Sequence, residues 1–519
     1  MSEQLQKAVS FTLEAGYQID KTAFDFLEIL SKTEDPIALM KKAIKKIELL
    51  TQKPLFIDRS ILEELAKETP QKAEEAKPAP VPTVHEPKPL YESRKLPFQP
   101  YAKEVQADVT VIEDPSGEIC TTGCVEDYLE YFRDRFKRLQ KLLRQRIDVK
   151  DATTISEALK APKNSKIKII AMITEKRESK QRIFLKVEDY DASATVFVPQ
   201  NLSQEVLEKT KVLLLDQVVC IVAVKGRNDL LIMDDLLFPE VPQKAPHKAS
   251  EPIYAALTSD LHVGSKLFMR EDFNRFLLWL KGKLGKPQQR EIASHVKYVV
   301  IAGDIVDGIG IYPGQVKELS IRDAYEQYRA ASKLLEQIPD YIELIIIPGN
   351  HDASRKALPQ PALPKNYAEP IYEAREVQSL GNPCTISLHG VEVLIYHGRS
   401  LDDIIANAPN INFETPNKAM KIMLQCRHLA PIYGQRTLIA PEKRDFMVIE
   451  RAPDIFQTGH VHVQKTDVYR GVVMVNSGAW QGRTTYQRKM GLEPTPGVVP
   501  VINLQTLQAT SLDFSNEAR

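Results

Sequence analysis

Five short motifs in the second half of the chain carry residue types that bind divalent metal ions. A single Gly-Asp or Gly-Asn pair occurs by chance in many chains, but five motifs in this order, each after an apolar run, are a specific signal. Carboxylate, amide and imidazole groups suit a pair of ions that can clamp the attacking and leaving oxygens of a phosphoryl transfer. The motifs therefore predict a two-metal phosphoesterase site. They are Asp260-Leu261-His262, Gly303-Asp304-Ile305-Val306-Asp307-Gly308, Gly349-Asn350-His351-Asp352, His397-Gly398 and Gly459-His460-Val461-His462.

The motifs need strands to bring them together. Short apolar or β-branched runs bounded by glycine indicate buried strands, and such a run precedes each motif. Helical spacing of apolar residues over 272–284 and 321–338 predicts helices between some of these runs. Strands that alternate with helices favour an α/β sheet, in which sites form beyond the carboxyl ends of the strands. Residues far apart in the sequence are thus expected to meet in one pocket. The predicted strands are 253–258, 298–302, 344–348, 391–396 and 454–458.

Residues 250–505 resemble the calcineurin-like metallophosphoesterase superfamily, whose core is a pair of sheets flanked by helices. Protein Ser/Thr phosphatases of that superfamily carry Asp-Arg-Gly in the second motif and Gly-Asn-His-Glu in the third. This chain has Asp307-Gly308 and Asp352 at those places, and its last two histidines share one Gly-His-x-His loop. These details are similar to the nuclease and phosphodiesterase branch, which includes the double-strand-break-repair nuclease.

The resemblance implies a role for each motif residue. Asp304 would bridge both ions, since a carboxylate has two oxygens and a negative charge, and the ions would activate a water for attack on phosphorus. Manganese is the expected metal, with zinc or iron as alternatives. His351 would bind no metal but would stabilise transition-state charge or protonate the leaving oxygen. Asp307 and Asp352 would orient ligands or cap turns. Metal one would be held by Asp260, His262, Asp304 and His462, and metal two by Asp304, Asn350, His397 and His460.

The middle of the chain has a different pattern, with short strands separated by turn signals. Five strands in so short a stretch suit a small barrel such as an OB-fold, and a helix over 202–210 is expected between the third and fourth strands. OB-folds often bind single-stranded nucleic acid through basic and aromatic groups. Only Phe184 and Phe197 are clear aromatics in these strands, and both could equally be core residues, so nucleic-acid binding and a packing role both stay open. The predicted strands are 166–173, 182–189, 192–199, 218–224 and 230–233.

A barrel followed directly by a phosphoesterase domain resembles the small subunits of replicative DNA polymerases. The metal ligands are largely lost in the eukaryotic members and present here, so the chain is most similar to the small subunit of the archaeal family D DNA polymerase. Segments 131–136 and 236–242 resemble that family too, and the likeness spans about 120–510. It implies a 3′–5′ proofreading exonuclease that hydrolyses DNA at a primer 3′ end or a single strand. It also implies a large catalytic polymerase subunit as partner and, through that complex, the sliding clamp.

The expected fold is multi-domain, with an α/β calcineurin-like metallophosphoesterase sandwich preceded by an OB-fold barrel and an N-terminal helical region. Residues 67–105 are rich in Pro, Lys and Glu, a composition that cannot bury a core and predicts a flexible linker. The predicted domains are 1–66 (helical), 67–105 (linker), 106–160 (basic amphipathic helix region), 161–245 (OB-fold) and 246–519 (phosphoesterase or nuclease domain).

A helix over 126–147 is expected to bury a stripe of Tyr128, Phe132, Leu139, Leu143 and Ile147. Its other face is strongly basic, which suits a contact with a phosphate backbone. A solvated helix face or a docking surface is the alternative, because charge runs on helices are commonly just solvated. The candidate nucleic-acid-binding residues are Arg133, Arg135, Lys137, Arg138, Lys141, Arg144 and Arg146.

The composition limits the class of protein. Lys plus Arg equals Asp plus Glu, at 69 each. A neutral chain is not a free-standing strong nucleic-acid binder, which favours a subunit of a complex. Five scattered cysteines and the lack of a signal peptide predict a cytoplasmic protein, and no run is long enough to predict a membrane span. Two other functions stay open. The intact ligand set argues against a non-catalytic scaffold or OB-fold binding subunit. The barrel and basic helix argue against a small-molecule phosphodiesterase or phosphatase.

Overall fold

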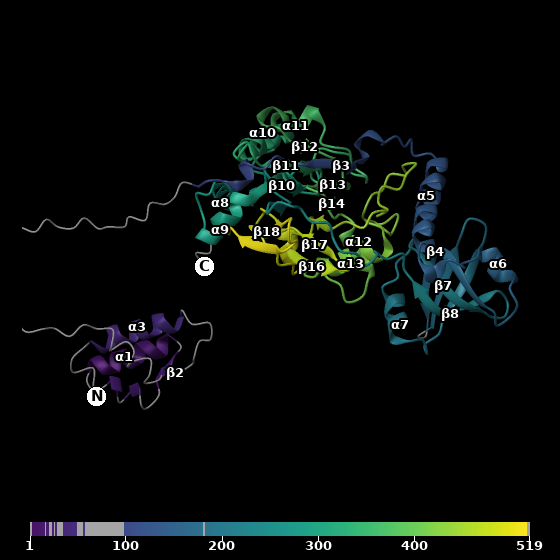
Figure 1. The fold of residues 1–519 in the computed structure, drawn as a ribbon, viewed down its shortest axis with the longest axis horizontal. Helices are drawn as coiled ribbons and strands as arrows, with labels where there is room; N and C mark the ends of the chain where they lie inside the picture. Colours follow the sequence, from purple (N-terminus) through teal and green to yellow (C-terminus); the bar gives the residue numbers. More distant parts are fainter. Residues whose placement is uncertain are drawn as a thin grey trace, which may run out of the picture. The chain divides into compact units, whose positions relative to one another are not determined.

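The computed structural model describes residues 3–15, 17–19, 23–24, 26–27, 35–48, 56–57, 98–179 and 182–515. The chain forms two compact units, Met1–Arg94 and Lys95–Arg519 (Figure 1). In the first unit, α1 (Glu3–Glu14) and α3 (Pro36–Glu48) share an apolar cluster, and β1 (Gln18–Ile19) pairs in parallel with β2 (Phe56–Ile57). Most of the predicted linker, residues 67–97, lies outside the described residues.

Two six-stranded sheets form most of the second unit, and we call them the sandwich. The first sheet has the order β12-β11-β10-β9-β18-β19, and the second has the order β16-β17-β15-β14-β13-β3. β9 to β12 run parallel, and β10 is buried over its whole length, as expected for a parallel strand covered on both faces. The strands are β3 (Val109–Glu113), β9 (Tyr254–Thr258), β10 (Val296–Ala302), β11 (Glu343–Ile347), β12 (Gln378–Ser379), β13 (Cys384–Leu388), β14 (Val391–Ile395), β15 (Ile455–Thr458), β16 (Lys465–Tyr469), β17 (Val472–Asn476), β18 (Val498–Asn503) and β19 (Ala509–Asp513).

Helices cover the outer face of each sheet. The inner faces of the two sheets share one apolar core, and separate clusters join each sheet to its own helices. Helices α8 to α11 lie over the first sheet, whereas α12 and α13 lie over the second (Figure 1). These helices are α8 (Arg270–Leu280), α9 (Pro287–His295), α10 (Ala324–Leu335), α11 (Lys365–Ala374), α12 (Leu401–Asn407) and α13 (Pro416–Cys426), followed later by the short α14 (Thr485–Lys489).

The prediction of a multi-domain α/β fold is confirmed, and each motif follows a strand of the sandwich. β9, β10 and β11 are parallel to one another in the first sheet, and β14 is parallel to β15 in the second. The carboxyl ends of parallel neighbours meet at one edge of a sheet, so the five motif loops leave the strands where a shared site can form.

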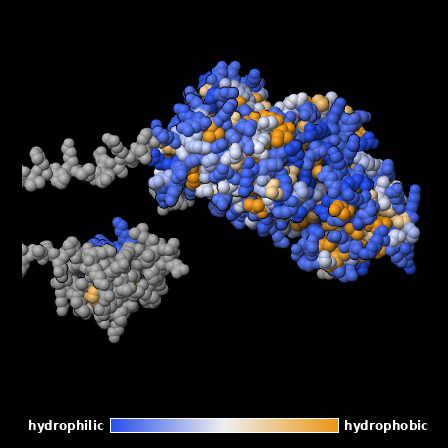
Figure 2. All heavy atoms as spheres, in the orientation of Figure 1, coloured by the Kyte–Doolittle hydropathy of each residue, from blue (hydrophilic) through white to orange (hydrophobic). Residues whose placement is uncertain are grey.

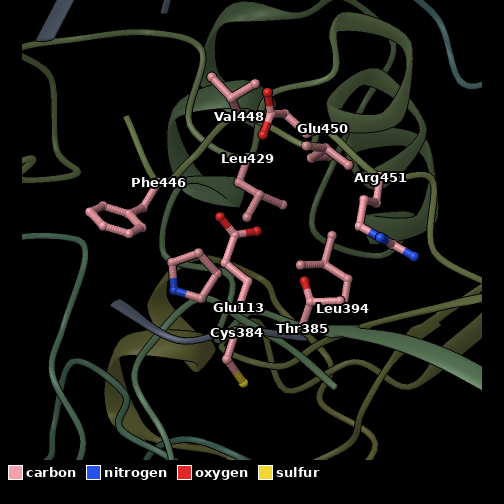
Figure 3. A pocket seen from close by; sticks show the side chains of 11 residues that line it. Glu113, Cys384, Thr385, Leu394, Leu429, Phe446, Val448, Glu450 and Arg451 are labelled. Atoms are coloured by element: carbon pink, nitrogen blue, oxygen red, sulfur yellow. The ribbon is translucent and has the colours of Figure 1, made fainter. Parts of the chain in front are cut away.

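A strand from before the barrel belongs to the sandwich. β3 pairs antiparallel with β13, at the edge of the second sheet. The predicted limits 246–519 therefore omit part of this domain, because a five-residue strand in an unremarkable sequence has no local signal for a partner so distant. Figure 3 shows the seam that results, a small cavity where Glu113 of β3 lies beside Cys384 and Thr385 of β13. Burial raises the pKa of Glu113, although Arg444, which pairs with it, acts to lower it.

The middle of the chain closes into a five-stranded barrel with the order β4-β5-β6-β8-β7. The strands predicted from sequence are all present, and the first and last extend further than expected. The predicted helix between the third and fourth strands is α7 (Gln204–Lys211), and α6 (Ile155–Lys160) precedes the barrel. The barrel strands are β4 (Lys166–Ser179), β5 (Arg182–Glu188), β6 (Ser193–Val198), β7 (Val218–Lys225) and β8 (Leu230–Leu237).

Helix α5 (Val125–Arg144) lies between the barrel and the sandwich. Its residues Phe136, Leu139 and Leu143 pack on β4 and β7, and Tyr131 joins the cluster over the second sheet. The predicted buried stripe was partly wrong, because Tyr128 is 39% exposed and Ile147, beyond the end of the helix, is 87% exposed. The helix instead buries the row that contains Tyr131 and Arg135, which a rule based on apolar spacing alone cannot find.

No helix in the described ranges is long and apolar enough to cross a membrane. On the face drawn in Figure 2, the second unit is mainly hydrophilic, and hydrophobic side chains occur in small separate areas.

Candidate metal centre

Most of the predicted metal ligands have an unusual backbone conformation. Asp260, His262, Asp304, His460 and His462 all have φ between 53° and 70°. Non-glycine residues with positive φ are uncommon, and such strain gathers at functional sites, where the surrounding structure holds it. Each of these residues lies two to four residues past the end of a strand, so the sharp turn of the chain there directs its side chain beyond the end of the sheet.

Two glycines allow the motif loops to approach one another. Gly303 has φ +90°, and a Cβ added there would lie 2.6 Å from Nδ1 of His397. A Cβ added at Gly349 would lie 2.1 Å from Oδ1 of Asp304. Both contacts are impossible for any other residue, so these glycines are required by the close packing of the second, third and fourth motifs.

The residues assigned to metal one form a tight buried group. Asp260, His262 and His462 bring one ligand atom each within 4.8 Å of one another. Nε2 of His262 lies 3.1 Å from Nε2 of His462, and Oδ1 of Asp260 lies 3.4 Å from Nε2 of His462. Oδ2 of Asp304 is 3.8 Å from Nε2 of His262. The predicted ligands of metal one therefore converge.

The residues assigned to metal two are adjacent, with one exception. Asp304 and His397 form a second group with Asp260, and Oδ2 of Asp304 lies 3.4 Å from Nε2 of His397. The same nitrogen lies 3.0 Å from Oδ1 of Asn350. His460 is in neither group. Its ring centroid is 5.2 Å from that of His397, and its Nε2 faces Asp402 instead of the other ligands.

The donor atoms fit a pair of divalent cations. Asp260 Oδ1 is a buried carboxylate oxygen that has no hydrogen bond of normal geometry, and it faces the imidazole nitrogens of two predicted ligands. A buried charged oxygen without a hydrogen bond is costly unless a cation neutralises it. Mixed carboxylate, amide and imidazole donors suit manganese, zinc or iron.

His351 lies beside the centre without completing it. Its Nδ1 donates a hydrogen bond to the backbone oxygen of Asp307 at 2.7 Å, and its Nε2 is 4.0 Å from Oδ2 of Asp304. Burial lowers the pKa of His351 to about 4, although the charge of Asp304 acts in the opposite direction. His262, Asp307 and His351 also bring ligand atoms within 4.8 Å of one another, but the Nδ1 of His351 is already hydrogen-bonded to the backbone oxygen of Asp307.

Asp307 and Asp352 support the motif loops through hydrogen bonds to a predicted ligand and to the backbone. Oδ1 of Asp307 lies 3.0 Å from Nδ1 of His262 and accepts a hydrogen bond from it. Asp352 accepts hydrogen bonds from the backbone N–H groups of Ile305, Val306 and Gly349, which ties the second motif to the third. These contacts are those of residues that orient ligands and cap turns.

The predicted ligands strongly influence one another's protonation. Burial acts to lower the pKa of His262, but the hydrogen bond with Asp307 and the charge of Asp304 raise it to about 8. Burial likewise acts to lower the pKa of His397, and Asp304 raises it to about 9. Burial acts to raise the pKa of Asp304, but His397 and His351 hold it well below its ordinary value. In the metal-free chain, His262 and His397 therefore carry protons at neutral pH.

Metal binding to the metal-free chain is accordingly expected to release about two protons at pH 7, because imidazole must be neutral to bind a cation. The apparent manganese affinity should rise as pH increases through 8 and 9, the pKa values of His262 and His397. Calorimetric titration with manganese in two buffers of different ionisation enthalpy measures the proton release directly. Heats that do not depend on the buffer would contradict this account of the site.

Three contacts at the centre involve residues that the motifs did not indicate. Nε2 of Gln487, on α14, lies 3.1 Å from Nδ1 of His462. Asp402 and Arg399 contact His460, and their position just after His397 is the only sequence signal that could have identified them. The side chain of Gln487 comes from the far end of the chain, where no pattern points to it.

The basic helix divides into two faces. Arg133, Lys137, Lys141 and Arg144 are exposed, as a contact with phosphate requires. Arg146 lies beyond the helix and pairs with Asp148. Arg135 and Arg138 are buried, so the prediction that they face a phosphate backbone is wrong.

A buried polar network explains why Arg135 is inside. Its Nε donates to Oδ2 of Asp445 at 2.7 Å, and its other nitrogens donate to the hydroxyl of Tyr131 and the backbone oxygen of Pro431. Nε2 of His428 donates to the same carboxylate at 2.8 Å, because its Nδ1 accepts from Ala430 N. The network joins α5 to the sandwich. Arg135 therefore has a structural role and does not face a nucleic-acid backbone.

The family model and the related sequences that match this chain both describe subunits of DNA polymerases. Residues 255–467 match the family model that describes the B subunit of DNA polymerases alpha and epsilon. A relative from Archaeoglobus fulgidus, named DNA polymerase II small subunit, is 38% identical over 94% of this chain and 94% of its own. Relatives of the same name from Methanocaldococcus jannaschii and Pyrococcus furiosus are 39% and 40% identical over 78% and 75% of this chain. The matched regions cover 68% and 64% of those two relatives.

Among solved structures, an archaeal phosphodiesterase aligns with 50% of this chain and 99% of its own. The identity is 14% and the TM-score is 0.24, a score too low to support a conclusion.

Proposed function

This chain belongs to the archaeal DNA polymerase II small subunits, and we propose that it is the metal-dependent 3′–5′ proofreading exonuclease of a heteromeric DNA polymerase. The observation that carries the proposal is the convergence of side chains from five separate loops on one buried centre. There, Asp260 Oδ1 lacks a normal hydrogen bond and faces the nitrogens of His262 and His462. A scaffold has no need of such an arrangement, whereas a two-metal hydrolase requires it.

The metal ions would be held by the residues already described. Asp260, His262, Asp304 and His462 would hold the first, and Asp304, Asn350, His397 and His460 the second, with manganese the expected metal. Bound ions would activate water and stabilise the leaving oxygen of a phosphodiester. Asp307 fixes the ring orientation of His262, and the backbone oxygen of Ala302 fixes that of His397 through its Nδ1 at 2.8 Å.

The substrate we propose is the mismatched 3′ end of a DNA primer, with nucleoside monophosphate as product. An unpaired end costs less to separate from the duplex than a paired one, so it would reach the centre more readily. The barrel supports a single-strand substrate. We assign it to the OB-fold from its strand order, and on it the half-buried rings of Phe184 and Phe197 lie with centroids 5.2 Å apart. Such a ring pair can stack bases of any sequence.

The partners we propose follow from the family. The relatives are small subunits by name, so a large catalytic polymerase subunit is the expected partner of this chain. The sliding clamp would be reached through that complex. The exposed residues Arg133, Lys137, Lys141 and Arg144 of α5 are the proposed contacts to the DNA backbone, since they have the right charge and accessibility.

Replacing His351 with alanine is expected to lower the rate of phosphodiester hydrolysis by about 100-fold or more, the loss that follows removal of one group placed to stabilise transition-state charge. The metal content should stay unchanged, because His351 is not among the proposed ligands. Rates on an oligonucleotide and metal analysis of the same samples measure both effects. His247→Ala is the matched control, since His247 pairs with Asp454 and does not contact the proposed ligands. A normal rate in His351→Ala would contradict the role given to this residue.

A further inference from the structure

We propose that Asp402, held by Arg399, is a positioning residue that fixes the ring of His460 so that Nδ1 is the nitrogen turned to the metal. The inference rests on the proposed metal centre and goes beyond it, because no motif assigns either residue a role. It begins from one irregularity. Of the four imidazoles assigned to metal, His460 alone is contacted through Nε2 by residues that are not themselves proposed metal ligands.

The other three rings share one arrangement. His262 contacts Asp307, His397 contacts the backbone oxygen of Ala302, and His462 contacts Gln487, in each case through Nδ1. Their Nε2 atoms face the centre, where they lie within 3.8 Å of another proposed ligand. A metal-binding imidazole usually has its second nitrogen held by the protein, which sets the ring orientation and the tautomer.

His460 has the reverse arrangement. Its Nε2 lies 3.3 Å from Oδ1 of Asp402 and 3.2 Å from a terminal nitrogen of Arg399. Its own backbone N–H donates to Oδ2 of Asp260 at 2.9 Å, which fixes the main chain beside metal one. With the backbone and Nε2 both held, Nδ1 is the nitrogen left to bind a cation.

Asp402 suits the role of an acceptor for this ring. Its side chain is 15% exposed, and Arg399 donates to its Oδ2 at 2.8 Å. A metal on Nδ1 would leave the proton of His460 on Nε2, which would donate a hydrogen bond to Oδ1 of Asp402. Arg399 cannot donate to a protonated Nε2, so it would donate to Oδ2 of Asp402 alone. Arg399 would then neutralise that carboxylate oxygen, so that the acid stays ionised beside the centre.

The local fold makes the pair a rigid unit. Arg399 comes just before α12 and Asp402 lies in its first turn, and both closely follow His397, two residues past the end of β14. One loop therefore supplies a proposed ligand of metal two and the anchor for another. Loss of Asp402 is expected to weaken metal two and leave metal one intact, since neither residue contacts His262 or His462 in the described structure.

The test is a calorimetric titration of the metal-free full-length chain with manganese, which needs no substrate. Asp402→Asn should weaken the second site by about 10- to 100-fold, the usual effect of removing an outer partner of a metal-bound histidine. Asp402→Glu should restore most of the affinity, because it returns an ionised acceptor. The first site should be unchanged in both variants.

Asp403→Asn is the matched control. Asp403 is a buried carboxylate on the same helix, and it accepts hydrogen bonds from the backbone of Arg436 and Thr437. The inference is overturned if Asp402→Asn leaves both sites unchanged, or if Asp403→Asn weakens the second site equally, which would mean a general effect on α12. If wild type binds two ions and hydrolyses no DNA, the proposed exonuclease fails while this titration still decides the role of Asp402.

Discussion

Replacing Asp304 with asparagine is expected to abolish metal-dependent hydrolysis and to empty both metal positions. Asp304 is 1% exposed, and its Oδ2 lies 3.4 Å from Nε2 of His397 and 3.8 Å from Nε2 of His262. Asp260 also lies in both groups, but Asp304 is the one ligand assigned to both metal positions. Asparagine keeps the size and one acceptor oxygen, which can still receive the hydrogen bond from the backbone of His351. The change removes the charge that two cations would share.

The expected loss of rate is at least about 100-fold, the order seen when one preorganised charge-stabilising group is removed. Metal analysis of the purified variant, beside oligonucleotide hydrolysis, measures both effects. Asp454→Asn is the control, because Asp454 is equally buried but pairs with Lys244 and His247. Full occupancy of both metals in Asp304→Asn would contradict the bridging role.

Replacing Asp445 with alanine is expected to destabilise the second unit by about 3–5 kcal/mol, the cost of leaving one partner of a buried ion pair uncompensated. Arg135 has 0% exposure and would keep its charge without the carboxylate that it contacts at 2.7 Å. His428 would lose its acceptor as well. Urea denaturation followed by the fluorescence of Trp279 and Trp480, both buried in the cluster that joins the first sheet to its helices, measures the change.

Two further variants identify the cause. Asp151→Ala breaks an ion pair in which the carboxylate is 68% exposed, and it should barely change the transition. Arg135→Met in the Asp445→Ala background should recover part of the lost stability, because it removes the buried unpaired charge. An Asp445→Ala transition equal to wild type would contradict the structural role of this network.

The sequence predicts most of the side chains that meet at the candidate metal centre, for a physical reason. Predicted ligands such as Asp260 and Asp304 come two residues after apolar strands, so that strand patterning and residue type together place them at the end of a sheet. Asp402 and Gln487 could not be predicted in this way. Each acts through one contact with a histidine on another loop, and only the folded chain brings the two together.

The same limit explains the errors elsewhere. Arg135 was expected on the exposed face of its helix because charged side chains are rarely buried without a partner. Its partner, Asp445, is 310 residues away in sequence. β3 was missed as part of the sandwich because its partner, β13, follows only after the whole barrel. Local patterns predicted the elements, whereas pairings between distant segments needed the structure.

The most direct test of the proposed function is degradation of a 5′-labelled single strand and of a 3′-mismatched primer–template, with manganese, by wild type and Asp304→Asn. Each is assayed alone and with the large polymerase subunit. The account predicts loss of nucleotides from the 3′ end, faster at the mismatch than at a paired end and absent in the variant. No cleavage by wild type even with the large subunit, or equal cleavage by Asp304→Asn, would contradict a proofreading nuclease centred on Asp304.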